Sequence, residues 1–220
     1  MSALLLEPVS HTYLLDARTI VPGATEILSD LTDLSKANPQ DVAVAKERGT
    51  NAHIATAFFD RDDLDEETVD AVTNELLDGY KRFRTETGFT PIEIERTYYH
   101  DRYGFATTID RLGWLFGKLA IVELKATSIH NPVAALQTAA QLEACNHVRK
   151  AQGEKKLAVT RYACRLLPGR YDLQEHKNPN DLRVFLACLT RHAWRIENDK
   201  QINRQRFAAV TDPIFVRAGA

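Results

Sequence analysis

Residues 103–125 read YGFATTIDRLGWLFGKLAIVELK, two runs of aromatic, β-branched and aliphatic residues separated by a Gly-Lys pair. Such runs are typical of β-strands, so we expect strands over residues 103–115 and 119–126. Gly117 and Lys118 between them predict a two-residue hairpin turn. This stretch therefore predicts an antiparallel hairpin within a larger sheet.

The hairpin carries charged residues among apolar neighbours. If Phe116 pairs with Leu119, Asp110 faces Lys125 directly across the two strands. Side chains alternate with period two along a strand, so Asp110, Glu123 and Lys125 share one face of the hairpin. The sequence thus predicts two carboxylates and an ammonium group in one small patch.

Two interpretations of this patch are open. Buried charges cost several kcal/mol unless they are paired or bound to metal, so the patch could be a structural ion pair at the sheet surface. It could instead bind a hard cation, because the oxygens of Asp110 and Glu123 suit Mg²⁺ or Mn²⁺. Lys125 could then orient or deprotonate a water that attacks a phosphodiester.

The rest of the chain predicts one α/β domain around this hairpin. Apolar residues recur at helical spacing in four segments, and three further segments have the composition of strands. The predicted helices cover residues 41–59, 66–87, 133–152 and 181–197, and the predicted strands cover residues 92–100, 157–167 and 171–176. This order of elements predicts a single domain with a central mixed β-sheet flanked by helices.

The composition is that of a globular protein with unevenly distributed charge. The chain has 28 Lys and Arg, 30 Asp and Glu, and 44% hydrophobic residues, which excludes a uniformly basic or disordered protein. Residues 1–145 hold 13 basic and 23 acidic residues, whereas residues 146–220 hold 15 and 7. The basic C-terminal third is either a solvated face or a surface for phosphates.

Asp110 followed by a hairpin and then Glu123-x-Lys125 resembles the PD-(D/E)XK nuclease superfamily. The chain is most similar to the RecB-type branch, which is found in phage-encoded and recombination-associated exonucleases. Segments near residues 11–28 and 165–171 are also similar to phage members, so the resemblance covers most of the chain.

Three further motifs of that branch have counterparts here. Gly49-x-x-x-His53 matches the upstream Gly-x-x-x-His motif, and Glu95 matches a glutamate that precedes the aspartate strand. Gln137 matches the glutamine of a Gln-x-x-x-Tyr motif on a later helix, although Gln141 stands at the tyrosine position. Their common order along the chain makes the resemblance more specific than any single motif.

The resemblance implies a fold and a set of roles. It implies a restriction-endonuclease-like core at about residues 41–176, within a single nuclease domain over residues 1–220 that ends in a basic helix and tail at 179–220. The ligands implied for one or two Mg²⁺ or Mn²⁺ ions are His53, Asp110, Glu123 and the backbone carbonyl of Leu124. The catalytic residues implied are Glu95, Asp110, Glu123, Lys125 and Gln137, of which Lys125 acts on the water and Gln137 holds the lysine or the phosphate.

Each assignment has a structural alternative. His53 could be a hydrogen-bonded core histidine, Gln137 an exposed polar residue on an Ala-rich helix, and Glu95 the partner of Arg96 or Arg111 in an ion pair. The residues expected to contact DNA phosphates are Arg149, Lys150, Lys155, Lys156, Arg191 and Arg195. The three cysteines, Cys145, Cys164 and Cys188, are too far apart in sequence for the cluster motif of a related branch, so we expect no iron–sulfur cluster.

The sequence as a whole predicts a Mg²⁺- or Mn²⁺-dependent deoxyribonuclease, an exonuclease of phage or bacterial DNA recombination, repair or processing. The alternative is a non-catalytic DNA-binding module on the same fold, a partner of a recombinase or helicase. DNA is the expected ligand in both, with a recombination protein as a further partner and no membrane contact. With neither a signal peptide nor a membrane span predicted, we expect a cytoplasmic location, in the host cytoplasm if the protein is phage-encoded.

Overall fold

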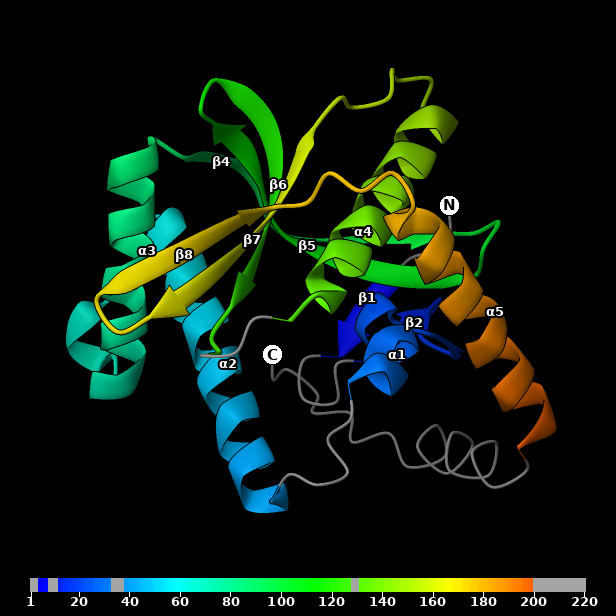
Figure 1. Cartoon of the computed structure of the whole chain (residues 1–220), viewed down its shortest axis with the longest axis horizontal. Helices are drawn as coiled ribbons and strands as arrows, with labels where there is room; N and C mark the ends of the chain where they lie inside the picture. The colour runs from blue at the N-terminus through cyan, green and yellow to red at the C-terminus, as the bar shows by residue number, and fades with distance from the viewer. Residues whose placement is uncertain (1–3, 8–11, 33–37, 128–130, 200–220) are drawn as a thin grey trace, which may run out of the picture.

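The computed structural model describes residues 4–7, 12–32, 38–127 and 131–199, and its centre is a five-stranded sheet in the order β4-β5-β6-β7-β8 (Figure 1). The strands are β4 (Thr90–His100), β5 (Phe105–Leu115), β6 (Lys118–Lys125), β7 (Thr160–Leu167) and β8 (Arg170–Glu175). Strands β6 and β7 are parallel, and the other neighbouring pairs are antiparallel. The predicted mixed sheet is confirmed.

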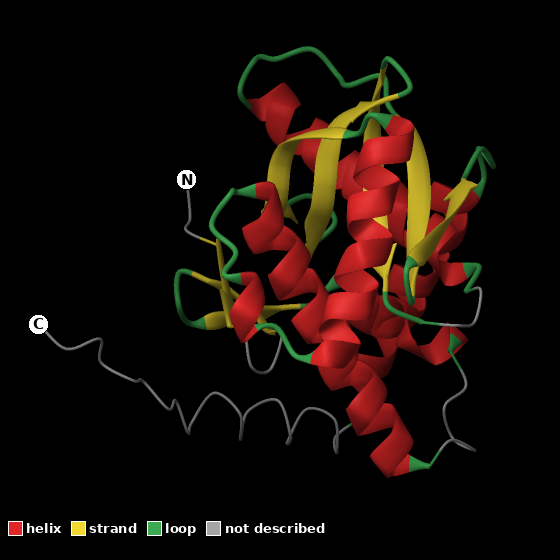
Figure 2. Cartoon of the chain, turned by 90° about the vertical axis from the view of Figure 1, so that its left-hand side faces the viewer, coloured by secondary structure: helices red, strands yellow, loops and turns green. Residues whose placement is uncertain are grey.

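Helices cover both faces of this sheet (Figure 2). The α-helices are α1 (Ala24–Leu28), α2 (Pro39–Asp60), α3 (Ala71–Thr87), α4 (Val133–Ala151) and α5 (Asp181–Asn198), and two short 3₁₀ helices are η1 (Ser29–Leu31) and η2 (Glu66–Thr68). One apolar cluster joins the sheet to α2 and α3, and another joins it to α1, α4 and α5. The sheet is therefore the middle layer of three. Within the described ranges no helix is long and apolar enough to cross a membrane.

Capping residues set the ends of the helices that carry the site. The side chain of Asn38 accepts from the backbone N–H of Gln40 at the start of α2, and the side chain of Asn131 accepts from Val133 at the start of α4. The helix expected at 66–87 begins later, at Ala71, because Asp70 caps it there and the preceding residues form η2. These caps fix where α2 and α4 enter the layers on either side of the sheet.

The β5–β6 hairpin has a different turn from the one predicted. Its two central residues are Phe116 and Gly117, with φ values of 51° and 73°, rather than Gly117 and Lys118. Trp114 pairs with Leu119, so the register differs by two residues from the predicted pairing. Continued along the strands, it places Asp110 opposite Glu123 rather than opposite Lys125. A shift of two preserves the face, so the three charges still lie together.

The N-terminal residues form a second sheet that the sequence did not predict. Its strands are β1 (Leu4–Glu7), β2 (Thr12–Leu15) and β3 (Thr19–Val21), all antiparallel. It is tied to β5 by the backbone of Ala106, which donates to the carbonyl of Pro22 at 3.0 Å. The hydroxyl groups of Tyr13 and Thr108 are 2.8 Å apart. The N-terminal segment thus lies against β5 beside Asp110. Of the basic helix and tail predicted at 179–220, the helix is α5, and residues 200–220 lie outside the described residues.

Candidate metal centre

The side chains expected to act in catalysis converge where β5 and β6 diverge. The β5–β6 pairing ends at Arg111 and Val122, one residue before Asp110 and Glu123. Helix α2 approaches from one side of the sheet and α4 from the other. The residues brought together are His53 from α2, Glu95 from β4, Asp110 from β5, Glu123 and Lys125 from β6, and Gln137 from α4.

Three of these residues form a group that could hold a metal ion. One ligand atom each from His53, Glu95 and Asp110 lies within 4.8 Å of the other two. His53 Nδ1 is 3.3 Å from Glu95 Oε1 and 3.7 Å from Asp110 Oδ1. One imidazole and two carboxylates are a donor set suited to Mn²⁺ and, through the carboxylates, to Mg²⁺. The residues therefore fit a divalent cation.

Asp110 is buried and fixed in place. Only 6% of its surface is exposed, and its Oδ2 accepts a hydrogen bond of 2.7 Å from the backbone N–H of Leu124. Burial, followed by the nearby charge of Glu123, raises the pKa of Asp110 to about 8. Burial and the neighbouring acid thus favour the protonated form of this carboxyl group when no cation is bound. A divalent cation would neutralise the same crowded carboxylates.

His53 responds to the same acidic surroundings. Burial alone would lower its pKa, but the carboxylates of Asp110 and Glu95 outweigh burial and raise it to about 9. Burial alone would raise the pKa of Glu95. The hydrogen bond and positive charge of His53, and then those of Arg111, outweigh burial and lower this pKa below its ordinary value. The two carboxylates thus favour the protonated imidazolium form of His53 when no cation is bound.

Glu123 and Lys125 form the second half of the site. The Lys125 ammonium donates to Glu123 Oε1 at 2.6 Å and to Gln137 Oε1 at 2.9 Å. Gln137 is itself held by Thr25, whose hydroxyl oxygen is 3.4 Å from its Nε2. Burial would lower the pKa of Lys125, but Glu123 and Asp110 raise it above its ordinary value. In this arrangement the neighbouring acids favour the charged form of Lys125, which donates hydrogen bonds.

The backbone at Glu95 is strained. Its φ is 52°, a left-handed conformation that is rare for a residue with a side chain in the middle of a strand. Arg111, which is fully buried, donates to Glu95 Oε1 at 2.9 Å and to Asp60 Oδ2 at 2.5 Å. Glu93, two residues away, pairs instead with Arg96. The network around Arg111 thus holds the strained Glu95 side chain beside His53.

The ion pair of Arg111 with Glu95 is one of the structural alternatives weighed from the sequence, whereas the pair of Arg111 with Asp60 was not predicted. Asp60 ends α2, and its carboxylate also accepts from Tyr80 at 2.5 Å and from Arg84. A possible signal is the arginine next to Asp110 in an otherwise apolar strand, because a buried guanidinium needs partners. The position of Arg111 predicts that an acidic residue pairs with it, but not which one.

Gln141 stands where the Gln-x-x-x-Tyr motif has tyrosine. It is fully buried, and its Nε2 donates to Glu123 Oε2 at 2.6 Å and to the backbone carbonyl of Thr108 at 2.8 Å. The other oxygen of Glu123 already accepts from Lys125. Gln141 therefore fixes the orientation of Glu123 and links α4 to β5 and β6.

The basic residues expected to contact DNA phosphates are not grouped around the candidate metal centre. Arg149 pairs with Glu154, and both Arg191 and Arg195 pair with Asp30. Arg149 lies 12 residues beyond Gln137, about 18 Å along α4. The remaining residues of the set, Lys150, Lys155 and Lys156, are exposed near the C-terminal end of α4.

The three cysteines, Cys145, Cys164 and Cys188, are free and buried, and burial raises the pKa values of Cys145 and Cys164.

Comparisons with known proteins give a distant structural likeness and no match in sequence. No protein-family model matches the sequence, and no curated protein is similar to it in sequence. Among solved structures, the fold is similar to that of a "putative exonuclease" from Eubacterium rectale, with a TM-score of 0.45 and 15% sequence identity. The similarity covers 69% of this chain and 68% of that chain.

Proposed function

We propose that this protein is a metal-dependent nuclease that hydrolyses phosphodiester bonds in DNA. The observation that carries the proposal is the convergence of Asp110, Glu123 and Lys125 at the divergence of β5 and β6, with His53 and Glu95 beside them. A structural ion pair needs one acid and one base. It does not account for a histidine and two further carboxyl groups packed within one buried site.

In this proposal the ligands are His53, Asp110, Glu123 and the carbonyl of Leu124, with Glu95 either bound directly or through water. A divalent cation supplies Lewis acidity to the phosphoryl oxygen and lowers the pKa of a bound water. Lys125 donates hydrogen bonds to the attacking water or to a phosphate oxygen. Gln137 holds the ammonium group in position, and Gln141 holds Glu123.

The finer parts of the proposal extend this chemistry. We place the protein in the RecB-type branch of the PD-(D/E)XK nucleases, as a single domain over residues 1–220, with exonuclease activity in DNA recombination, repair or processing. The support is the order of motifs from Gly49 to Gln137 and the position of their side chains in the structure. A recombination protein as partner and a cytoplasmic location belong to the same proposal.

The test is cleavage of end-labelled linear single- and double-stranded DNA with Mg²⁺, Mn²⁺ or EDTA. Lys125→Ala is expected to lower the cleavage rate about 10²- to 10⁴-fold while metal binding remains. Asp110→Asn is expected to lose both cleavage and metal binding. Lys118→Ala is the matched control, because Lys118 is an exposed lysine at the other end of β6.

Closed circular single-stranded DNA separates the two modes of cleavage, since an exonuclease needs an end and an endonuclease does not. Wild-type protein that binds DNA but cleaves none of these substrates with either metal would overturn the nuclease proposal. The non-catalytic DNA-binding module would then be the better interpretation.

A further inference from the structure

A polar cavity of about 210 Å³ lies away from the metal centre. It is formed between the β4–β5 turn and the C-terminal half of α4, and extends to the loop before β7. His100 lines it and lies five residues beyond Glu95, about 16 Å along β4. None of the residues assigned to the metal centre lines this cavity.

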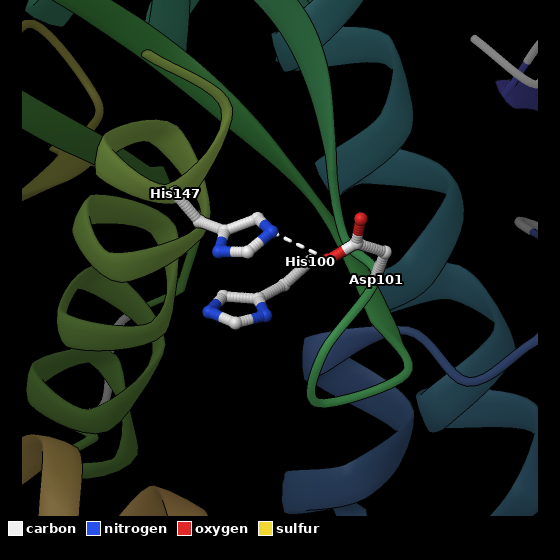
Figure 3. Close-up of side chains that lie close together, drawn as sticks. All are labelled: His100, Asp101 and His147. Atoms are coloured by element: carbon white, nitrogen blue, oxygen red, sulfur yellow. Dashed lines mark hydrogen bonds and ion pairs between the residues drawn. The ribbon is translucent and has the colours of Figure 1, made fainter. Parts of the chain in front are cut away.

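A stack of aromatic rings forms one wall. His100 is 1% exposed, and its ring stacks on that of His147 with a centroid distance of 3.9 Å (Figure 3). It also stacks on the ring of Tyr103, with a centroid distance of 4.3 Å. His100 Nδ1 accepts a hydrogen bond of 3.2 Å from the backbone N–H of Tyr103. Its proton is therefore on Nε2, toward Glu143 Oε1 at 3.7 Å. The stacked rings of His100, His147 and Tyr103 therefore form one side of the cavity.

The two acids at the cavity already face imidazole rings. Asp101 Oδ1 is 2.6 Å from His147 Nε2, as the dashed line in Figure 3 marks, and Glu143 faces His100. Three cationic side chains line the same cavity from three different segments: Arg102, Lys150 and Lys156. In the part of the chain that the structure describes, none of these three forms an ion pair. The cavity therefore has an excess of positive charge.

We propose that this cavity binds a phosphate group. A guanidinium, two ammonium groups and the His147 side chain from separate segments can surround an oxyanion, and charged donors give the strongest hydrogen bonds to phosphate oxygens. This inference does not depend on the metal centre. The phosphate belongs either to a nucleic-acid strand or to a free nucleotide or inorganic phosphate, which share the same chemistry.

The main competing ligand is a metal ion. One atom each from His100, Asp101 and His147 lies within 4.8 Å of the others, which is compatible with a cation. However, His100 Nδ1 already accepts from Tyr103, and His147 Nε2 is already bonded to Asp101. A cation would also meet the charges of Arg102, Lys150 and Lys156. The geometry and charge together favour an anion.

The test follows the imidazole signals of His100 and His147 by ¹H–¹⁵N NMR in the full-length protein with EDTA present. The probes are pyrophosphate, dAMP, and 5′-phosphorylated oligothymidylates of increasing length. We expect saturable shifts of both rings. The double variant Lys150→Ala/Lys156→Ala is expected to weaken binding about tenfold or more, as loss of two charged hydrogen bonds implies. Lys118→Ala, an equally exposed lysine beyond the other end of β5, is expected to change it less than about twofold.

Comparison of the affinities for the different probes identifies the source of the phosphate. Affinity that increases with the length of the oligonucleotide indicates a nucleic-acid strand. Equal affinity for pyrophosphate and the oligonucleotides indicates a free ligand. The proposal is overturned if no phosphate compound shifts the rings, or if the lysine variant binds as wild type does. It is also overturned if Zn²⁺, added without EDTA, alone shifts them. All these readouts are independent of cleavage, so they do not depend on the nuclease proposal.

Discussion

Asp110 and His53 determine how the metal-free protein responds to pH. The folded-state pKa of Asp110 is about 8 against an ordinary 3.8, and that of His53 is about 9 against 6.5. Both groups therefore bind protons more tightly in the folded state than in the unfolded chain. Their contribution to the free energy of unfolding falls as pH rises, from about 4 to 8 for Asp110 and from about 6.5 to 9 for His53.

Urea unfolding of the protein in EDTA across this pH range measures the effect. The amide in Asp110→Asn cannot titrate, so the variant is expected to gain stability relative to wild type as pH increases. Saturating Mn²⁺ should reverse the trend for wild type, because metal binding displaces the protons. A wild type that becomes more stable than Asp110→Asn at high pH in EDTA would contradict the prediction.

A second prediction at this scale concerns Gln141. Its Nε2 is the donor for both Glu123 Oε2 and the carbonyl of Thr108, and the side chains of Gln141 and Glu123 are buried. Gln141→Leu keeps a similar volume but leaves two acceptors unpaired, so we expect a loss of about 1–3 kcal/mol in the free energy of unfolding. Gln152→Leu, at the exposed end of the same helix, is the control and should stay within about 0.5 kcal/mol. Equal stability of the two variants would show that the Gln141 bonds contribute little.

At the scale of elements, alanine substitutions of Gly49 in α2 and Gly79 in α3 are expected to change the stability of the protein in opposite directions. A Cβ built on Gly79 would lie 2.6 Å from the carbonyl oxygen of Leu167 and still closer to that of Arg170, in the β7–β8 turn. Nothing lies within 4 Å of a Cβ built on Gly49. Gly79→Ala is expected to cost about 1–3 kcal/mol through overpacking, whereas Gly49→Ala should add about 0.5–1 kcal/mol through helix propensity. Thermal unfolding of both variants measures these effects, and a stabilised Gly79→Ala would mean that α3 can move off the turn.

The strands and helices of the main sheet could be predicted because their patterns are local. The face shared by Asp110, Glu123 and Lys125 was also predictable, since it depends only on the parity of the register. The turn itself was not, because Phe116 adopts a positive φ that sequence reasoning reserves for glycine. Glu95 is a similar case, since its strained backbone is imposed by contacts distant in sequence, with Arg111 and His53.

Long-range contacts also explain what was missed near the N-terminus. Strands β1 to β3 have three or four residues each, too few for alternation to be recognised. What positions them is tertiary contact, such as Tyr13 with Thr108, 95 residues apart. The same holds for Gln141, whose role follows from the position of Glu123 on another element. The sequence predicts which residues carry chemistry better than it predicts which residues hold them.

At the scale of the whole molecule, the candidate metal centre joins the layers on the two faces of the sheet. His53 comes from α2, whose layer packs through the cluster that includes Tyr80 and Val122. Gln137 comes from α4, whose layer packs through the cluster that includes Ile121 and Phe185. The two clusters share no residues, and a cation held by His53 and the carboxylates of β5 and β6 would add a link between α2 and the sheet.

This link predicts a distribution of protection in hydrogen–deuterium exchange. Saturating Mn²⁺ should slow exchange in α2 around His53 as well as in β5 and β6, and a hundredfold excess over Kd would stabilise the fold by about 2.7 kcal/mol. His53→Ala should lose the effect in α2 but keep part of it in the strands, because Asp110 and Glu123 remain. Asp110→Asn should lose both. If Mn²⁺ protected the strands of wild type without protecting α2, His53 would not be a ligand, and the metal would be held by the sheet alone.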